Sequence, residues 1–175
     1  NVNELLIGDK NAIMVAARIL GYGKEYEFEY DGIEQSVDLT KLEPIKVDFK
    51  NLPKGTNEFS YKLPNSKRTI TFKLLNGKDE KEIDLENKAL EKISKLQTSG
   101  LTTRFKKMIL SVDGNSEKSY INNFVDNEFL SRDSLSFRQH LNGITPDIDM
   151  TTFVSDSSGK EIEVVIPITV RFFWP

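Results

Sequence analysis

The sequence predicts an α+β protein in which small antiparallel hairpins pack with about four helices. Three observations lead to this class. Residues 24–39 alternate acidic and aromatic side chains around an Asp-Gly pair, which is typical of a β-hairpin. Residues 78–96 and 118–144 carry apolar side chains at helical spacing. Residues 148–173 resemble a second hairpin, with two strands around a Ser-Ser-Gly turn.

The first element expected is a short, largely buried helix over residues 8–23. Asp9 can cap its N-terminus, and Gly21 and Gly23 follow its apolar run. In the hairpin that follows, Asp31-Gly32 favours a type I′ turn.

Short strands are expected next, at residues 46–50, 57–63 and 68–75, with the last two joined across 64–67. Residues 104–114 are expected to contain a strand or an extended link that closes at an Asp-Gly pair. These segments supply the β structure of the middle of the chain.

The helical part consists of a solvated amphipathic helix over 78–96 and two tandem helices within 118–144. The tandem helices are expected to separate near Ser131, which can cap the second one. In the final hairpin the second strand is expected to be long and to run into the aromatic end of the chain.

Two regions follow from this order of elements. Residues 1–76 hold the first helix and a β-rich part, and residues 77–175 hold the helices and the C-terminal hairpin. We expect both to pack as one compact unit. No internal repeat is evident, although the hairpins at 25–39 and 148–170 look alike.

Composition limits the function classes. The net charge of -3 and the pI of about 5.4 argue against a nucleic-acid partner. No apolar run is long enough for a membrane helix, and no secretory signal opens the sequence, so a cytosolic setting is expected. The absence of cysteine excludes disulfides and thiolate metal sites. The start at Asn1 and the end at Pro175 suggest part of a longer chain.

Few residues suggest catalysis. His140 is the only histidine, and it has no nucleophile or acid at a triad spacing. Asp147 and Asp149 could hold a divalent cation, but a turn in which Asp147 caps backbone amides is the simpler interpretation. The acidic residues of 25–29 are more simply the wet face of a strand. Phosphate-binding and nucleophile-elbow motifs are absent. We therefore expect no enzymatic activity, no cofactor and no metal.

Two groups of residues indicate partner binding instead. Arg132, Asp133 and Arg138 are expected on one helix, where they could pair with a neighbouring subunit or with the chain's own hairpin. Local salt bridges of little energetic weight are the simpler interpretation of this group. Arg171, Phe172, Phe173 and Trp174 close the chain. Strand alternation would put Phe172 and Trp174 on one face and Phe173 on the other, so one face would need cover from elsewhere in the chain or from a partner.

Four stretches follow one another along nearly the whole chain. They are an Ile-Gly-Asp start with an Arg-Ile pair and a Tyr-Gly end (7–23), an Arg-Asp-Ser helix start (132–134), a Pro-Asp-Ile-Asp turn (146–149), and a Phe-Phe-Trp-Pro end behind a proline (167–175). In this order and spacing they resemble the T4-like bacteriophage base plate protein family, the baseplate hub assembly proteins of contractile-tailed phages.

The resemblance implies zinc-ribbon-like hairpins, since many members carry C-x-x-C pairs there. Here Ser155 and Ser158 stand at the positions of such a pair, and the first hairpin has no cysteine either. A serine hydroxyl is a poor zinc ligand, so we expect hairpins that keep their form without metal.

The resemblance also implies a function. The protein would be a non-enzymatic phage tail protein that helps to assemble the baseplate hub by binding other hub or tail proteins, as a chaperone or as a retained virion component. Oligomerisation within the baseplate is left open. Its location would be the host cytoplasm during assembly, with the tail baseplate of the virion as the second location if it is retained.

Two alternatives remain. One is a generic peptide-binding module that uses the edge of the last hairpin and its aromatic residues. The other is a metal-dependent hydrolase that uses His140, Asp147 and Asp149.

Overall fold

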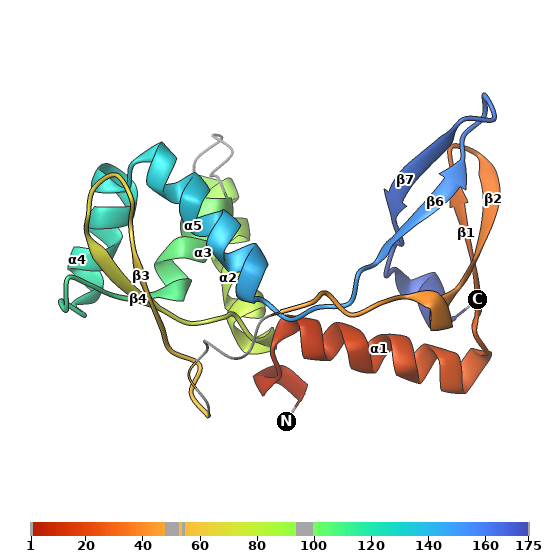
Figure 1. Cartoon of the computed structure of the whole chain (residues 1–175), viewed down its shortest axis with the longest axis horizontal. Helices are drawn as coiled ribbons and strands as arrows, with labels where there is room; N and C mark the ends of the chain where they lie inside the picture. The colour runs from red at the N-terminus through yellow and green to blue at the C-terminus, as the bar shows by residue number, and fades with distance from the viewer. Residues whose placement is uncertain (1, 48–52, 54, 94–99, 175) are drawn as a thin grey trace. The chain divides into compact units, whose positions relative to one another are not determined.

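The fold is described by a computed structural model that covers residues 2–47, 53, 55–93 and 100–174 (Figure 1). These residues form five α-helices and three small antiparallel sheets, which confirms the α+β class. Among them, no helix is long and apolar enough to cross a membrane.

The chain divides into two compact units. The first unit contains residues 1–7 and 47–145, and the second contains residues 8–46 and 146–175. This division differs from the expected regions 1–76 and 77–175 and from the single unit expected for them. The physical reason is that the hairpins near the two ends of the chain bury apolar side chains in one common cluster.

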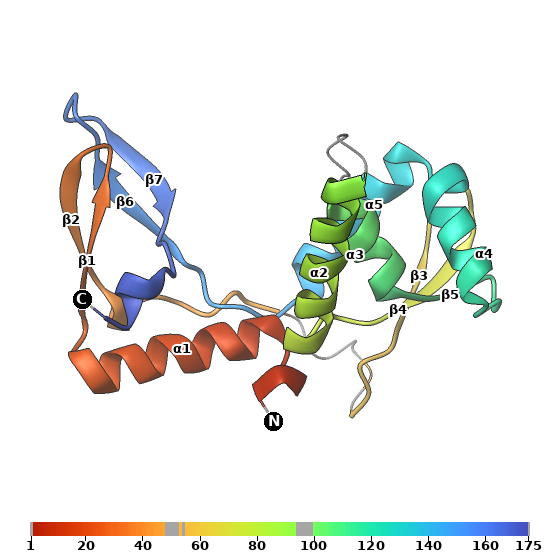
Figure 2. The same ribbon diagram turned by 180° about the vertical axis from the view of Figure 1, so that it is seen from behind.

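The first unit is built around a three-stranded sheet in the order β3-β4-β5. Its strands are β3 (Phe59–Lys62), β4 (Thr69–Phe72) and β5 (Ile109–Val112). Its helices are η1 (Val2–Glu4), α2 (Gly77–Ile93), α3 (Gly100–Met108), α4 (Lys118–Asn123), the π-helical turn η4 (Phe124–Glu128) and α5 (Ser131–Ile144). Figure 2, seen from behind, shows α2 in front of α3.

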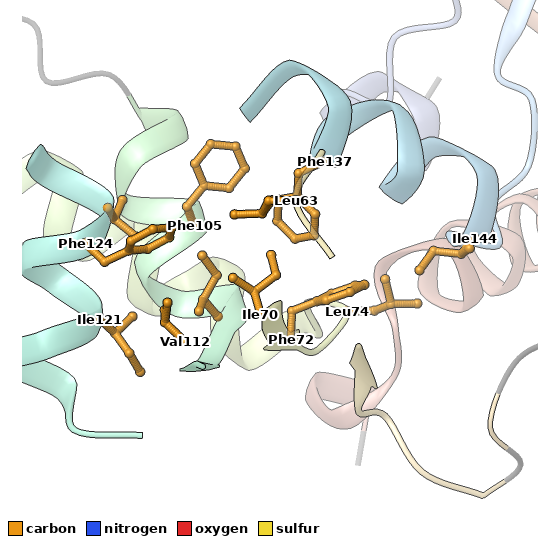
Figure 3. Packing of buried hydrophobic residues seen from close by; sticks show 12 residues of the cluster. Leu63, Ile70, Phe72, Leu74, Phe105, Val112, Ile121, Phe124, Phe137 and Ile144 are labelled. Atoms are coloured by element: carbon orange, nitrogen blue, oxygen red, sulfur yellow. The ribbon is translucent and has the colours of Figure 1, made fainter. Parts of the chain in front are cut away.

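The core of the first unit is rich in phenylalanine. Figure 3 shows Phe105 of α3 beside Phe137 of α5, Phe72 of β4 below Phe137, and Ile144 farther along α5. Phe72 of β4 meets Phe137 edge-on, with 4.9 Å between the ring centroids, and both side chains are fully buried. Such aromatic pairs add to the energy of burial. The sheet and α5 are therefore held together by this core.

Several expectations in the first unit need correction. Residues 100–108 form a helix that the sequence pattern did not indicate, and β5 follows it directly. Its buried side chains explain why it forms, because tertiary packing stabilises a short helix that is weak alone. Ser131 is the first residue of α5 and does not cap it; Leu130 holds the cap position without a side-chain bond. Residues 48–50 and 94–96, parts of an expected strand and an expected helix, lie outside the described residues.

The second unit combines a helix with two hairpins. Helix α1 (Ile7–Tyr22) belongs to it from Gly8 onward. The strands are β1 (Glu25–Tyr30) with β2 (Ile33–Asp38), and β6 (Thr151–Ser155) with β7 (Glu161–Val165). Two 3-10 turns, η2 (Leu39–Lys41) and η5 (Val170–Phe172), complete it. The type I′ turn is confirmed, because Asp31 and Gly32 both have positive φ, at 51° and 73°.

The two hairpins of the second unit lie side by side, as Figures 1 and 2 both show. Their inner faces share one cluster with α1 and η5, which includes Tyr26, Phe28, Val154, Val164 and Phe172.

Hydrogen bonds join the tips of these hairpins. The Ser157 hydroxyl donates to Asp31 Oδ2 at 2.6 Å, and Gln35 Nε2 donates to the Ser155 carbonyl at 3.0 Å. The resemblance between the hairpins that the sequence suggests thus corresponds to two elements that pair in space.

The start of α1 is packed tightly against the chain segment that follows residue 145. A Cβ added to Gly8 would lie 1.8 Å from the Pro146 carbonyl oxygen, so only glycine fits there. Asp147 fixes the same place: its carboxylate accepts from Asn11 Nδ2 at 3.1 Å, and its carbonyl accepts from the Ile45 backbone N–H at 2.8 Å. Three separate chain segments are therefore connected at this point.

The expected long final strand is wrong. Strand β7 ends at Val165, two residues before Pro167, which has no N–H to donate to a ladder. Residues 170–172 then form the 3-10 turn η5, in which the Trp174 N–H donates to the Val170 carbonyl at 3.1 Å. The alternation of faces predicted for 172–174 therefore does not apply.

Candidate functional site

Asp133, expected at a partner interface, is instead a structural residue of the first unit. Its side chain is fully buried. Its two carboxylate oxygens accept hydrogen bonds from Asn65 N–H at 2.8 Å, Asn65 Nδ2 at 2.9 Å and Ser66 N–H at 2.9 Å. These donors belong to the turn between β3 and β4. The sequence analysis considered pairing with a neighbouring subunit or with the chain's own hairpin. In the structure Asp133 pairs with the chain's own β3–β4 hairpin.

The titration of Asp133 follows from these contacts. Burial by itself would raise the pKa of the carboxyl, because a charge is costly to desolvate. The hydrogen bonds from Asn65 and Ser66 outweigh this effect and lower the pKa to about 2. The carboxylate is thus ionised at neutral pH and holds the β3–β4 turn on the first turn of α5.

The two arginines of the same helix have different surroundings. Arg132 and Arg138 are both exposed, and neither makes a hydrogen bond or ion pair within the described part of the chain. Arg138 lines a groove, whereas Arg132 is absent from its lining. The position of Arg138 in the groove is consistent with partner binding, whereas Arg132 is an exposed side chain outside the groove.

The aromatic end of the chain separates into an anchor and a displayed part. Phe172 is fully buried and meets Tyr26 edge-on, with 4.9 Å between the ring centroids. The Tyr26 hydroxyl in turn donates to the Pro167 carbonyl at 3.0 Å. Phe172 is therefore core and not an interface residue, which corrects the expectation for it.

Trp174 is displayed by this anchored turn. Its side chain is 71% exposed, and Val170, four residues earlier, is 76% exposed. Phe173 is half-buried and meets the Trp174 ring edge-on at 6.5 Å, while Arg171 is exposed. A large apolar side chain in water beside an arginine is typical of an interaction surface. We call Val170, Arg171 and Trp174 the C-terminal surface.

His140 has a packing role. Its ring stacks on Tyr61 at 4.3 Å and meets Phe72 edge-on at 5.9 Å. Burial lowers the pKa of His140, which favours the neutral ring. Within the described residues, no carboxylate or nucleophile pairs with it.

The two aspartates of the hydrolase hypothesis also serve the fold. Asp147 accepts from Asn11 and from the Ile148 N–H at 2.7 Å, in agreement with the capping interpretation. Asp149 accepts from Thr151 N–H and Thr151 Oγ1, and these bonds lower its pKa. Asp147 and Asp149 belong to the second unit, whereas His140 belongs to the first.

The acidic face of the first hairpin is exposed, as expected for a wet face. Glu25, Glu27 and Glu29 all point to solvent, and Glu29 lies directly opposite Glu34 in the register of the strands. Nearby Asp38 accepts from Lys24 at 2.8 Å, and hydrogen bonds from Lys24 and from Thr40 lower its pKa.

The hairpin tips hold polar bonds where the resemblance would place a metal knuckle. Ser158 Oγ donates to Asp156 Oδ1 at 2.6 Å, and the Lys160 N–H donates to the same oxygen at 3.0 Å. In the described part of the chain, no group of three or more His, Cys, Asp or Glu side chains is arranged to hold a metal ion.

The edge-strand hypothesis also changes. The last hairpin is present as β6 and β7, but residues 166–169, which were expected to extend its second strand, form no strand, and Ile166 is 1% exposed within the core of the second unit. Ile168 is half-buried and packs against the same core. Both side chains therefore belong to the core and not to an exposed binding edge.

A groove in the first unit was not indicated by any sequence motif. It lies between α3 and α5 and consists of two adjoining hollows of about 380 and 290 Å³. Its residues are scattered between positions 6 and 145, so only the fold brings them together.

Comparisons with protein-family models, with curated proteins and with solved structures found no significant match to this chain. The four motifs that resemble the base plate family each contribute a residue to the packing of the fold. Gly8, Asp133, Asp147 and Phe172 come from its four stretches, and each is held in a tight or buried contact. The fourth motif also places Trp174 on the surface.

Arg18, from the first motif, is a second residue of that motif with a buried structural contact. It is 3% exposed, and its guanidinium donates to the carbonyls of Gly23 at 3.0 Å and Glu25 at 3.2 Å. The guanidinium also lies over the Tyr22 ring at 5.2 Å from the centroid. Arg18 thus fixes the passage from α1 into β1.

Proposed function

We propose that this protein is a non-enzymatic tail protein of a contractile-tailed phage that takes part in assembly of the baseplate hub by binding other hub or tail proteins. It acts as an assembly chaperone or as a retained component. It works in the host cytoplasm during assembly, and in the tail baseplate if it is retained. The order of the four sequence motifs supports the phage setting.

The observation that carries the binding role is the display of Trp174 on an anchored turn. Phe172 is fully buried below the turn, while Trp174 and Val170 remain in water. Such a turn pays little conformational entropy when a partner covers it, because its backbone is already fixed.

The energy available at this surface is substantial. Burying the exposed part of a tryptophan removes on the order of 150 Å² from water, which contributes on the order of 3 kcal/mol. Arg171 adds a guanidinium for a carboxylate or aromatic partner. Together they make a small hot spot of the kind that dominates protein interfaces.

The local roles of the candidate catalytic residues favour binding over chemistry. His140 stacks on Tyr61, and Asp147 and Asp149 accept bonds from neighbouring backbone and side-chain groups. Each of the three thus makes a local contact within its own unit, which supports a binding role for the protein.

The test is recovery of tail proteins from a phage-producing lysate with the tagged chain, quantified by mass spectrometry. Hub proteins are expected with the wild type and should be strongly reduced with Trp174→Ala. The matched control is Leu85→Ala, because Leu85 is a 68% exposed apolar residue on α2 of the other unit. Equal recovery with Trp174→Ala, or no tail protein with the wild type, would refute the proposal.

A further inference from the structure

The groove between α3 and α5 has an apolar part and a polar part. The larger hollow is mostly apolar, and the polar side chains Arg104, Asn142 and Thr145 also line it. Its apolar lining includes Leu6, Ile7, Leu74, Leu75, Met108 and Leu141. The smaller hollow adds the hydroxyl-bearing residues Thr102, Ser131 and Ser134. Leu101, Phe105 and Arg138 line both hollows, so the two form one continuous groove.

Arg138 gives both hollows of the groove a positively charged lining residue. Arg138 makes no ion pair or hydrogen bond within the described part of the chain, and no acidic residue lines either hollow. Arg104, by contrast, is paired with Glu80. A guanidinium with free donors beside an apolar floor matches a ligand that carries a carboxylate next to an apolar side chain.

The hydroxyl groups near Arg138 extend this match. Thr102, Ser131 and Ser134 form no side-chain hydrogen bond within the described residues, so their donors are available to the same carboxylate. The apolar hollow of about 380 Å³ lies at the low end of the size range of binding pockets. It therefore suits one or two large apolar side chains and not a large cofactor.

We propose that this groove binds a short segment of another polypeptide, in which one or two large apolar side chains enter the Leu141 hollow and a nearby Asp or Glu carboxylate pairs with Arg138. The two hollows share Leu101, Phe105 and Arg138 in their linings, so one leads into the other. An extended peptide with two different side chains fits this form. The site lies in the first unit and does not depend on the C-terminal surface or on the phage setting.

The experiment selects binders from a displayed library of random 12-residue peptides with the whole chain as bait. An enriched peptide is then titrated by calorimetry against three forms of the protein: wild type, Arg138→Gln and Arg132→Gln. Arg132 is the matched control, since it is an exposed arginine on the same helix outside the groove.

We expect enriched peptides to combine an acidic residue with large apolar ones. Arg138→Gln should weaken binding by about tenfold or more, because a hydrogen-bonded charge pair is lost, while Arg132→Gln should change it by less than about twofold. In methyl NMR spectra, bound peptide should shift Ile7 and Leu141 and leave Leu20 of the other unit unchanged.

Several outcomes would overturn this proposal. They are a selection without acidic residues or without any binder, equal losses for the two arginine variants, and shifts confined to other methyl groups. Decanoate is titrated alongside, as an apolar chain with a carboxylate but no peptide backbone. Its saturation of the groove in the absence of peptide binding would also overturn the peptide assignment.

Discussion

Replacing Asp133 by asparagine should destabilise the first unit more than a surface change can. Asparagine keeps the size of the side chain but replaces one carboxylate oxygen by an NH2 group. That group would face a backbone or side-chain N–H of Asn65 or Ser66, since both oxygens of Asp133 accept in the structure. At least one buried donor then loses its acceptor.

The magnitude follows from two terms. A hydrogen bond to a charged acceptor contributes about 1.5–3 kcal/mol, and a buried donor without a partner costs about 1–3 kcal/mol. We expect Asp133→Asn to lower the free energy of unfolding by about 3 kcal/mol.

The same carboxylate predicts a pH dependence. Its pKa is about 2 in the folded protein and 3.8 as the reference value. Because the folded-state pKa is lowered, the stabilisation is fully present above about pH 4 and is lost as the pH falls through about 2. The difference corresponds to about 2 kcal/mol for this buried group.

The assay is urea unfolding followed by far-UV circular dichroism at a series of pH values between about 2 and 7. The free energy of unfolding of the wild type should fall in the acid range. In Asp133→Asn this fall should be smaller, because the share caused by protonation of Asp133 is absent. Glu91→Gln, an exposed change on α2, serves as the control. A loss below about 1 kcal/mol at neutral pH, or an unchanged acid dependence, would refute the structural role of Asp133.

Three further predictions concern both units. Phe172→Ala should destabilise the second unit by about 3–5 kcal/mol, whereas Trp174→Ala should stay within about 0.5 kcal/mol in thermal unfolding; similar losses would contradict the division into anchor and displayed residue. Gly8→Ala should cost at least about 2 kcal/mol because of its backbone contact, while Gly21→Ala, with free space around it on the same helix, should be neutral or stabilising by up to about 1 kcal/mol; equal effects in chemical denaturation would disprove the contact. An NMR titration should give His140 a pKa below its usual value, so this residue removes stability as the pH falls through about 6.5; a raised pKa would exclude burial as the dominant effect.

The hairpins were predictable because their signals are local. The alternation in β1 and β2 and the Asp31-Gly32 turn determine face, register and turn type within 14 residues. The β6–β7 hairpin is equally local. The contact between the two hairpins could not be predicted in this way, because Asp31 and Ser157 are 126 residues apart in the sequence.

Other elements depend on tertiary contacts that no window of sequence contains. Helix α3 has only 9 residues, two of them threonines, and it forms where Thr103, Phe105 and Met108 enter the core. The turn η5 replaces an expected strand because Phe172 fills a site below Tyr26. In both cases packing overrides the local preference.

For the charged residues of α5, the sequence can predict which side chains are buried but cannot predict which groups they contact. Asp133 precedes the buried Phe137 by four residues, so helical periodicity puts both on the face that meets the core. That spacing could have identified Asp133 as buried and in need of hydrogen-bond donors. Nothing in the sequence names those donors, because they belong to a turn 67 and 68 residues away.

The same periodicity separates the two arginines but does not assign their roles. Arg132 and Arg138 are six residues apart, about 120° around the helix, so they cannot share one surface. Which of them faces a groove depends on α3, an element that the sequence pattern did not reveal. The candidate residue most worth testing is therefore Arg138, since its position between two hollows arises only from the packing of α3 on α5.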